Sequence, residues 1–182
     1  MIFPIVLYGD PVLKKKAQDV AEDDESVKGF VESMFETMYA AQGVGLAAPQ
    51  VGESLRVFVI DTTPMEEEEE DGVKKAFINP IMIEEIGEEW AFEEGCLSIP
   101  GIRADVNRNP QIKIEYLDEN WELLEETFDG MKARVIQHEY DHIEGKLFTD
   151  YLTPFKKRLI KGKLANISKG KTDAEYRVKV PR

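Results

Sequence analysis

Both histidines of the chain stand in one short run, His138-Glu139-Tyr140-Asp141-His142. Two residues four positions apart lie on the same face of an α-helix, with Cβ atoms about 5–6 Å apart, so both imidazoles can bind one cation. Glu139 would then lie beside the open side of the ion, where a carboxylate can accept and return the protons of an activated water. Ordinary helix histidines rarely fall into this pattern. The run therefore predicts a catalytic metal site on a helix.

The third ligand of such a site is less clear from the residues. Three protein ligands are usual at an open catalytic site, and the chain has no further histidine. The metzincin pattern H-E-x-x-H-x-x-G-x-x-H matches through Gly145 and fails at Phe148. The single cysteine, Cys96, lies between Gly95 and Pro100, and a thiolate there would be a good soft ligand. A lone cysteine is more often a small buried apolar residue, so a carboxylate and Cys96 both stay open.

A glycine-rich stretch, Gly43-Val44-Gly45-Leu46-Ala47-Ala48-Pro49-Gln50, formally matches the dinucleotide fingerprint G-x-G-x-x-A. It follows a helical pattern where the fingerprint follows a strand, and Pro49 interrupts the helix that should come next, so we reject that reading. The stretch is then either a plain tight turn or one wall of an active site. As a wall it would offer backbone groups to an extended peptide and the Gln50 amide to a developing oxyanion.

A third motif, Glu94-Gly95-Cys96-Leu97-Ser98, completes an ordered set with the two runs above. Together the three motifs resemble the peptide deformylase family. The likeness extends to the amino-terminal run Tyr8-Gly9-Asp10-Pro11-Val12-Leu13 and covers roughly residues 1–155. The resemblance implies antiparallel β-sheets packed around a central helix that carries the H-E-x-x-H motif.

The resemblance also implies a role for each site residue. Cys96, His138 and His142 would be the metal ligands, and Glu139 the general acid and base. The oxyanion donors would be the Gln50 amide and the Leu97 backbone N–H. The residues that would pair with the peptide backbone are Val44, Gly45 and Gly95. Those that would line the methionine pocket are Val44, Phe92, Met131 and Val135.

The implied reaction is removal of the N-formyl group from the first methionine of newly synthesised proteins, with release of formate. The implied partners are formyl-methionyl nascent polypeptides. The implied ion is one Fe²⁺ per chain, which Zn²⁺, Ni²⁺ or Co²⁺ can replace, and the residues alone cannot choose among these metals. In this mechanism Glu139 accepts a proton from the activated water and returns it to the leaving amine, while the two donors stabilise the oxyanion.

The elements that must position these residues can be read from the hydrophobic pattern. Apolar residues recur at three and four over 27–39, which predicts an amphipathic helix, and 130–142 is typical of a second, more buried one. A short basic helix is expected from Pro154 to about Leu164. Strands are expected over 56–61, 75–78, 81–86, 89–93, 102–106, 112–118, 122–128 and 176–180. A helix, several adjacent strands and a helix indicate the α+β class.

Length and charge bound the remaining possibilities. The 182 residues fit one metallohydrolase domain, 1–182, with a basic tail from about 153. The net charge of −13 argues against a protein that coats nucleic acid, yet 153–182 carry ten basic and two acidic residues. This +8 segment is either a docking arm for ribosomal RNA or a solvated tail. With no leader and no apolar run of about 18 residues, we expect a cytoplasmic protein that binds neither membrane nor DNA.

Other interpretations are weaker. The run Glu66 to Asp71 is expected to be a solvated loop, because nothing spaces its carboxylates for a cation. A zinc endopeptidase would share the helix motif but take its third ligand from a glutamate. A metal-stabilised binding module would need a closed four-ligand site, for which the chain offers no obvious fourth cysteine or histidine. A ribosome-binding relative without activity is disfavoured because no residue of the catalytic set is missing.

Overall fold

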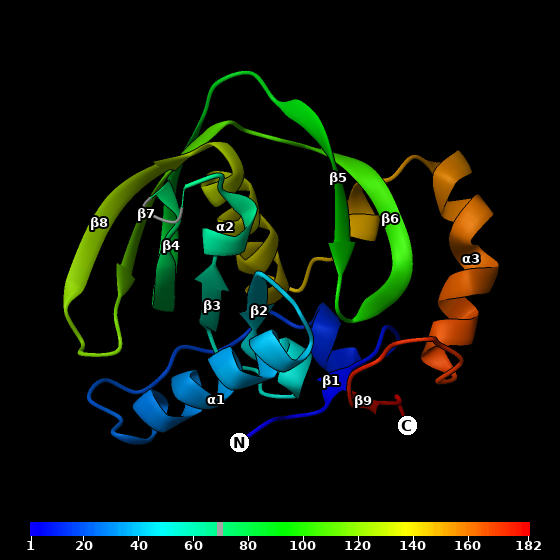
Figure 1. The fold of residues 1–182 in the computed structure, drawn as a ribbon, viewed down its shortest axis with the longest axis horizontal. Helices are drawn as coiled ribbons and strands as arrows, with labels where there is room; N and C mark the ends of the chain where they lie inside the picture. The colour runs from blue at the N-terminus through cyan, green and yellow to red at the C-terminus, as the bar shows by residue number, and fades with distance from the viewer. Residues whose placement is uncertain (69–70) are drawn as a thin grey trace.

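The computed structural model describes residues 1–68 and 71–182. One antiparallel sheet with the strand order β2-β3-β4-β7-β8 dominates the fold, and two smaller sheets pair β5 with β6 and β1 with β9 (Figure 1). In chain order the main elements are β1 (Ile5–Val6), α1 (Ser26–Ala40), β2 (Gly45–Ala47), β3 (Val57–Asp61), β4 (Lys74–Ile86), β5 (Trp90–Cys96), β6 (Ile99–Arg108), β7 (Gln111–Leu117), β8 (Leu123–Asp129), α2 (Gly130–Ile143), α3 (Pro154–Ser168) and β9 (Val178–Lys179).

Strand β3 of the large sheet is covered on both of its faces. Side chains alternate across a strand, so Val57 and Val59 join the apolar cluster of α1, whereas Phe58 and Ile60 join the cluster of α2. All five residues of this strand are buried. The unbroken apolar run that predicted β3 therefore belongs to a central strand with a helix on each side.

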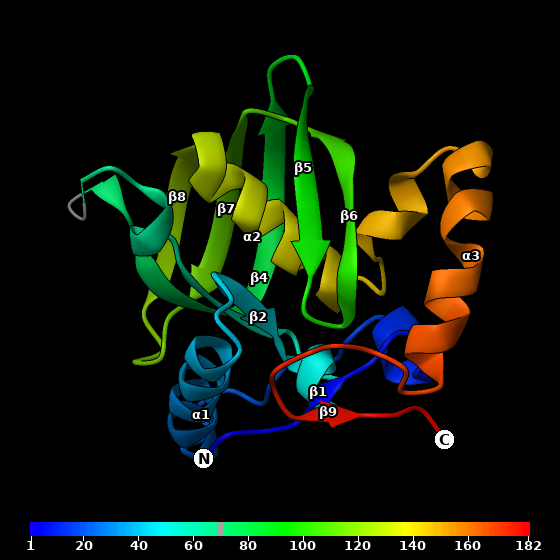
Figure 2. The same ribbon diagram turned by 45° about the vertical axis from the view of Figure 1, so that its right-hand side comes forward.

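Helix α2 is the centre of the molecule. It runs between the large sheet and the β5–β6 hairpin, as Figures 1 and 2 both show. Ala133 and Ile136 pack on the large sheet, and Arg134 donates to the carbonyl oxygens of Trp90 in β5 and Val106 in β6. The expectation of an α+β fold, with antiparallel sheets around a central helix, is confirmed.

Strand β4 differs from the sequence prediction, which had two strands over 75–78 and 81–86. The structure has one strand, in which the pairing with β7 shifts register between Ile78 and Ile81. Asn79 adopts a φ of 49°, and its side-chain amide bonds both the N–H and the carbonyl of Val20. The Asn–Pro pair therefore forms a β-bulge held by another segment, which local patterns do not reveal.

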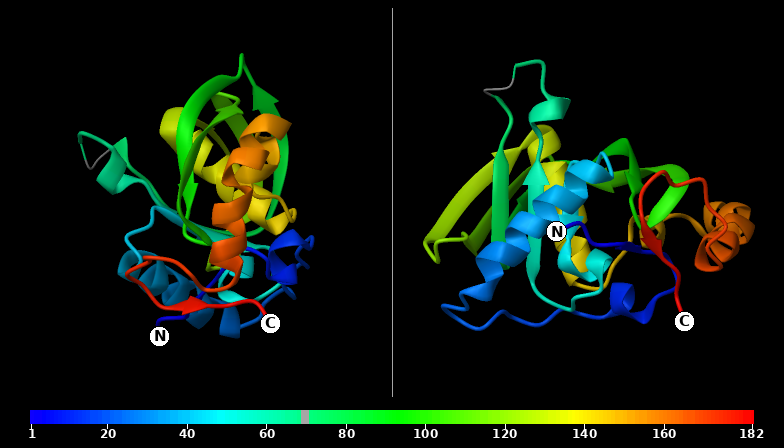
Figure 3. Two further views of the ribbon diagram at one scale, coloured as in Figure 1. Left: turned by 90° about the vertical axis from the view of Figure 1, so that its right-hand side faces the viewer. Right: turned by 60° about the horizontal axis from the view of Figure 1, so that its bottom comes forward.

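The basic C-terminal part is folded rather than extended. Helix α3 lies on the outer side of β6 and continues to Ser168, four residues beyond the expected end. The chain then returns so that β9 pairs in parallel with β1, Ile5 opposite Val178, and the two strands lie side by side in both views of Figure 3. The strand expected over 176–180 is thus present in a shorter form.

No helix of the described chain is long and apolar enough to cross a membrane. The acidic run Glu66 to Asp71 lies partly outside the described residues, which omit 69 and 70. Its remaining members follow the short 3-10 helix Thr63–Met65 at the β3–β4 connection.

Candidate metal centre and active site

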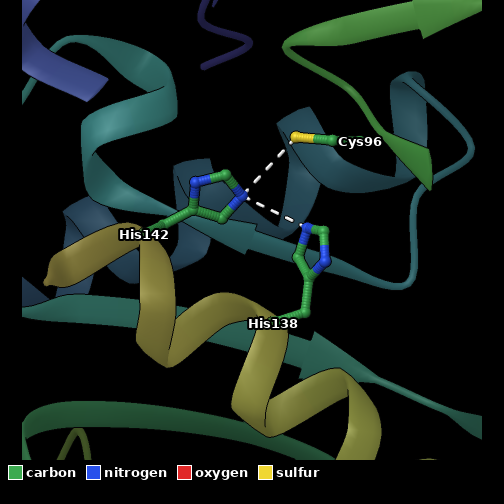
Figure 4. Close-up of side chains that lie close together, drawn as sticks. All are labelled: Cys96, His138 and His142. Carbon is green, nitrogen blue, oxygen red and sulfur yellow. Dashed lines mark hydrogen bonds between the residues drawn. The ribbon is translucent and has the colours of Figure 1, made fainter. Parts of the chain in front are cut away.

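The three predicted metal ligands converge on one point. The Nε2 atoms of His138 and His142 lie 3.2 Å apart, and Cys96 Sγ lies 3.5 Å from His142 Nε2 (Figure 4). The three donor atoms are all within 4.8 Å of one another. A divalent ion contacts nitrogen at about 2.0–2.1 Å and sulfur at about 2.3 Å. Donors with these spacings can therefore share one ion, and this group is a metal site.

Two elements position these ligands. His138 and His142 lie one turn apart on α2, as their spacing predicted. Cys96 is the last residue of β5, where a register shift after Glu94 sets it opposite Ile99. Burial lowers the pKa of His142 well below its usual value, so its imidazole is neutral and able to bind a metal. The sequence left the third ligand open between a carboxylate and Cys96, and in the structure the cysteine takes this place.

Glu94 fixes the orientation of His138, and sequence reasoning assigned it no role. Its Oε1 lies 2.9 Å from His138 Nδ1, so Nδ1 carries the hydrogen and Nε2 keeps its lone pair for the metal. Arg108 donates to both oxygens of Glu94, and Arg134 donates to Oε2 at 2.6 Å. Burial opposes ionisation of Glu94, but its hydrogen bonds with His138 and Arg108 and the charge of Arg108 hold its pKa well below the usual value.

A second polar chain runs outward from the same arginine. Arg108 Nη1 donates to Asp141 Oδ2 at 2.8 Å, and the Tyr151 hydroxyl donates to the same oxygen at 2.7 Å. The guanidinium of Arg108 also lies over the Tyr151 ring. Asp141, which lies between His138 and His142 on α2, therefore links α2 to β6 and to the segment before α3. Nothing in the spacing of these residues could have indicated this chain of contacts.

Glu139 lies beside the metal site with one unpartnered oxygen. Its side chain is 4% exposed, and within the described structure its Oε2 has no hydrogen-bond partner. Burial raises its pKa to about 7, although the charge of Arg108 acts in the opposite direction. A Cβ on Gly45 would lie 2.6 Å from Glu139 Oε1, so only glycine leaves room for the carboxylate. Such a carboxyl group can both accept and donate a proton near neutral pH.

Gln50 is oriented by its neighbours. Its Oε1 accepts from the Ala47 N–H at 3.0 Å, which turns Nε2 toward Cys96 Sγ at 3.4 Å and Ser98 Oγ at 3.3 Å. The side chain is 1% exposed. Leu97 follows the cysteine in the turn between β5 and β6, and within the described chain its N–H donates to no backbone carbonyl. The Gln50 amide is thus held close to the metal site, and the Leu97 N–H directly follows the ligand Cys96 in the chain.

A cavity of about 830 Å³ opens beside the metal site. The predicted site residues that line it are Val44, Gly45, Gln50, Phe92, Gly95, Cys96, Leu97, Met131, Val135, His138 and Glu139. His142 does not line the cavity and is 1% exposed, so it closes the metal site from behind. Residues from the C-terminal part also line the cavity, and no motif pointed to them: Lys163, Asn166, Ile167, Lys171, Thr172, Asp173, Ala174 and Tyr176.

Comparisons with known proteins agree with this geometry. Residues 2–158 match the family model described as polypeptide deformylase. All of the chain aligns with 97% of a peptide deformylase from Christiangramia forsetii at 59% identity, and with 98% of one from Cytophaga hutchinsonii at 61%. Peptide deformylase structures from Legionella pneumophila and Thermus thermophilus share 40% and 38% identity. The TM-scores are 0.82 for the Legionella structure and 0.84 for the Thermus structure. Each alignment covers 93% of this chain, and they cover 96% of the Legionella chain and 99% of the Thermus chain. The chain belongs to the polypeptide deformylase family.

Proposed function

We propose that residues 1–182 form a single metallohydrolase domain that removes the formyl group from the first methionine of newly synthesised proteins, with Glu139 as its general acid and base. Removal of the N-formyl group from nascent proteins is the reaction of the family to which the chain belongs. The observation that carries the assignment of Glu139 is the unpartnered, buried carboxylate oxygen next to three convergent metal ligands. The reaction would take place in the cytoplasm, where nascent chains emerge.

A formamide is a stable amide, so its hydrolysis needs an activated water, a polarised oxygen and a protonated leaving nitrogen. Cys96, His138 and His142 would hold a divalent ion, which would supply a Lewis acid able to lower the pKa of water from about 16 toward 7. Glu139 accepts a proton from the attacking water and then returns it to the departing amine nitrogen. With a pKa raised to about 7 by burial, its carboxyl group is suited to both steps.

The oxyanion donors in this proposal are the Gln50 amide and the Leu97 N–H. Gln50 cannot turn its Nε2 away from the site without losing the bond from the Ala47 N–H to its Oε1. Donors that are already oriented need no reorganisation when charge develops, and one good donor contributes about 3 kcal/mol to transition-state stabilisation. Formate and a free amino terminus then leave the site.

Substrate binding would use the two walls of the cavity. Val44 directly precedes β2, Gly45 is the first residue of β2, and Gly95 is in β5. The backbones of these three residues would pair with an extended peptide. The methionine side chain would enter an apolar group of cavity-lining residues: Val44, Phe92, Met131 and Val135. A flexible thioether packs well in such a pocket, whereas a charged first residue would lose its hydration.

For the metal we propose Fe²⁺ as the ion in the cell, with Zn²⁺, Ni²⁺ or Co²⁺ as replacements. One thiolate and two imidazoles suit several divalent ions of the first transition row. The partners in this proposal are formyl-methionyl nascent chains and the ribosome. The exposed basic residues of α3 would contact ribosomal RNA, and they are Lys156, Lys157, Arg158, Lys161 and Lys163.

The test is purification of the full chain without oxygen, metal analysis, and a formate-release assay on formyl-Met-Ala-Ser. The same peptide with an acetyl group, and one without a blocking group, are the controls. We expect about one metal ion per chain and formate from the formyl peptide alone. Cleavage of internal peptide bonds without formate release would instead indicate an endopeptidase and overturn the proposal.

A further inference from the structure

The segment between α3 and β9, residues 169–177, lies beyond the part of the chain that matches the family model. Figure 2 shows it returning from the lower end of α3 beneath β5 and β6 toward β1. Five of its residues line the active-site cavity, namely Lys171, Thr172, Asp173, Ala174 and Tyr176. This return segment is therefore part of the wall of the site.

Tyr176 makes the most specific contact of the return segment. Its hydroxyl donates to the carbonyl oxygen of Leu97 at 2.6 Å. A tyrosine hydroxyl is protonated and a good donor at neutral pH, and this distance is typical of a strong O–H···O bond. The ring packs against the apolar cluster that includes Leu46 and Met34, so the hydroxyl has little freedom to turn away.

Leu97 needs an external support because it lies in a two-residue turn. The Tyr8 N–H donates to the carbonyl oxygen of the neighbouring Ser98 at 2.9 Å, and the Gln50 amide donates to the Ser98 hydroxyl oxygen. The Leu97 carbonyl accepts from Tyr176, and in the part of the chain that the structure describes no other side chain donates to it. The bond therefore sets the tilt of the residue whose N–H adjoins the metal ligand Cys96.

Tyr176 is itself held on a rigid frame. Before it, Gly170 follows the end of α3; its φ of 81° reverses the chain, and its N–H donates to the carbonyl oxygen of Ile167. After it, the Arg177 carbonyl accepts from the Ile5 N–H at 2.9 Å, and β9 continues the pairing with β1. A side chain supported on both sides can hold another group within a fraction of an ångström.

We propose that Tyr176 is a positioning residue of the hydrolase: its hydroxyl fixes the Leu97 backbone so that the Leu97 N–H is aimed at the oxyanion. The proposal rests on the proposed function, in which that N–H is an oxyanion donor. It also gives the return segment a part in turnover. A donor that tilts away from the oxyanion destabilises the transition state more than the bound substrate. We therefore expect its misplacement to lower kcat and to leave KM nearly unchanged.

The test compares Tyr176→Phe with Tyr116→Phe. Tyr116 donates its hydroxyl to Glu126 in the large sheet and does not line the cavity, so the control removes one buried tyrosine hydroxyl elsewhere. Formate release is measured on formyl-methionyl peptides of one, three and five residues, with metal content and Tm for every variant. For Tyr176→Phe we expect kcat about tenfold lower at every length, KM within about twofold, and full metal content.

Four outcomes would overturn the proposal. Equal kcat for the two variants would show that the hydroxyl has no special role. A loss confined to KM, or one that grows with peptide length, would show that Tyr176 contacts the substrate instead. Loss of metal would show that it acts through Cys96. Wild-type protein that releases no formate would overturn the proposed function itself, which is a separate result.

Discussion

Glu139 illustrates how a single residue can be placed for reactivity at the expense of stability. A buried polar atom without a partner lowers the free energy of unfolding by about 1–3 kcal/mol, and Glu139 Oε2 is such an atom among the described residues. A side chain kept only for structure would find a partner. The same burial raises its pKa to about 7, which is where proton transfer in both directions is most effective.

Glu139→Gln separates the part of Glu139 in proton transfer from its effect on stability. The amide keeps the volume of the carboxylate but cannot accept a proton, so kcat should fall at least 100-fold. Metal content should be unchanged, because the ligands are untouched, and Tm should be equal or higher, because an amide is cheaper to bury than a charge. Steady-state formate release, metal analysis and thermal unfolding check these points. Near-normal turnover would remove Glu139 from the mechanism.

Gly45→Ala tests the close approach of β2 to Glu139. The added Cβ would lie 2.6 Å from Glu139 Oε1, so the carboxylate must move by several tenths of an ångström. We expect kcat to fall at least tenfold while the protein stays folded. Gly162→Ala is the matched control, since its Cβ would meet nothing within 4 Å and alanine favours the helix. If both variants are equally active, the approach of β2 has no role in catalysis.

At the scale of elements, the site depends on a buried ionic cluster that joins three of them. Glu94 comes from β5, Arg108 from β6 and Arg134 from α2, and both arginine side chains are under 5% exposed. Each guanidinium is costly to bury without its carboxylate. The cluster therefore holds the hairpin against the helix and, through Glu94, orients His138. Metal binding and the packing of α2 are thus supported by the same residues.

Glu94→Gln should destabilise the protein by about 3 kcal/mol, because two buried arginines lose their counter-charge. Metal affinity should fall about 10–100-fold as His138 loses its support. The neighbouring Glu93→Gln is the control, since Glu93 pairs with Arg103 at 2.8 Å where both side chains are 60% exposed, and such a pair contributes about 0–1 kcal/mol. Urea unfolding and metal titration measure both effects. Similar stability of the two variants would argue against the ionic cluster.

For the whole molecule, local patterns were enough to predict much of the fold and the metal site. The four-residue spacing of His138 and His142 indicated the metal site because both lie on one helix. The unbroken apolar run of β3 indicated a strand because each face of that strand meets a helix. Contacts between segments far apart in sequence were not visible. The Glu94–Arg108 pair and the Tyr176–Leu97 bond span 14 and 79 residues, and no periodicity encodes them.

The charge of the molecule is unevenly distributed, and this leads to the last prediction. The chain carries −13 overall, yet the segment 153–182 is basic and includes α3, whose Lys157 and Lys161 are exposed. Exposed Phe155 and Leu159 lie on the same helix. A rigid basic helix on an acidic body can contact phosphates while the rest of the surface is repelled, which orients the molecule on an RNA surface.

We therefore expect the full chain to co-sediment with ribosomes at low salt, and to dissociate as salt increases, because phosphate contacts release counterions. The double variant Lys157→Glu/Lys161→Glu should bind about tenfold more weakly and keep its formate release on short peptides. Lys15→Glu/Lys28→Glu has the same charge change on exposed residues outside α3 and is the control. Equal losses of ribosome binding for both variants would show that binding depends only on net charge. No loss of binding for either variant would show that α3 does not contact the ribosome.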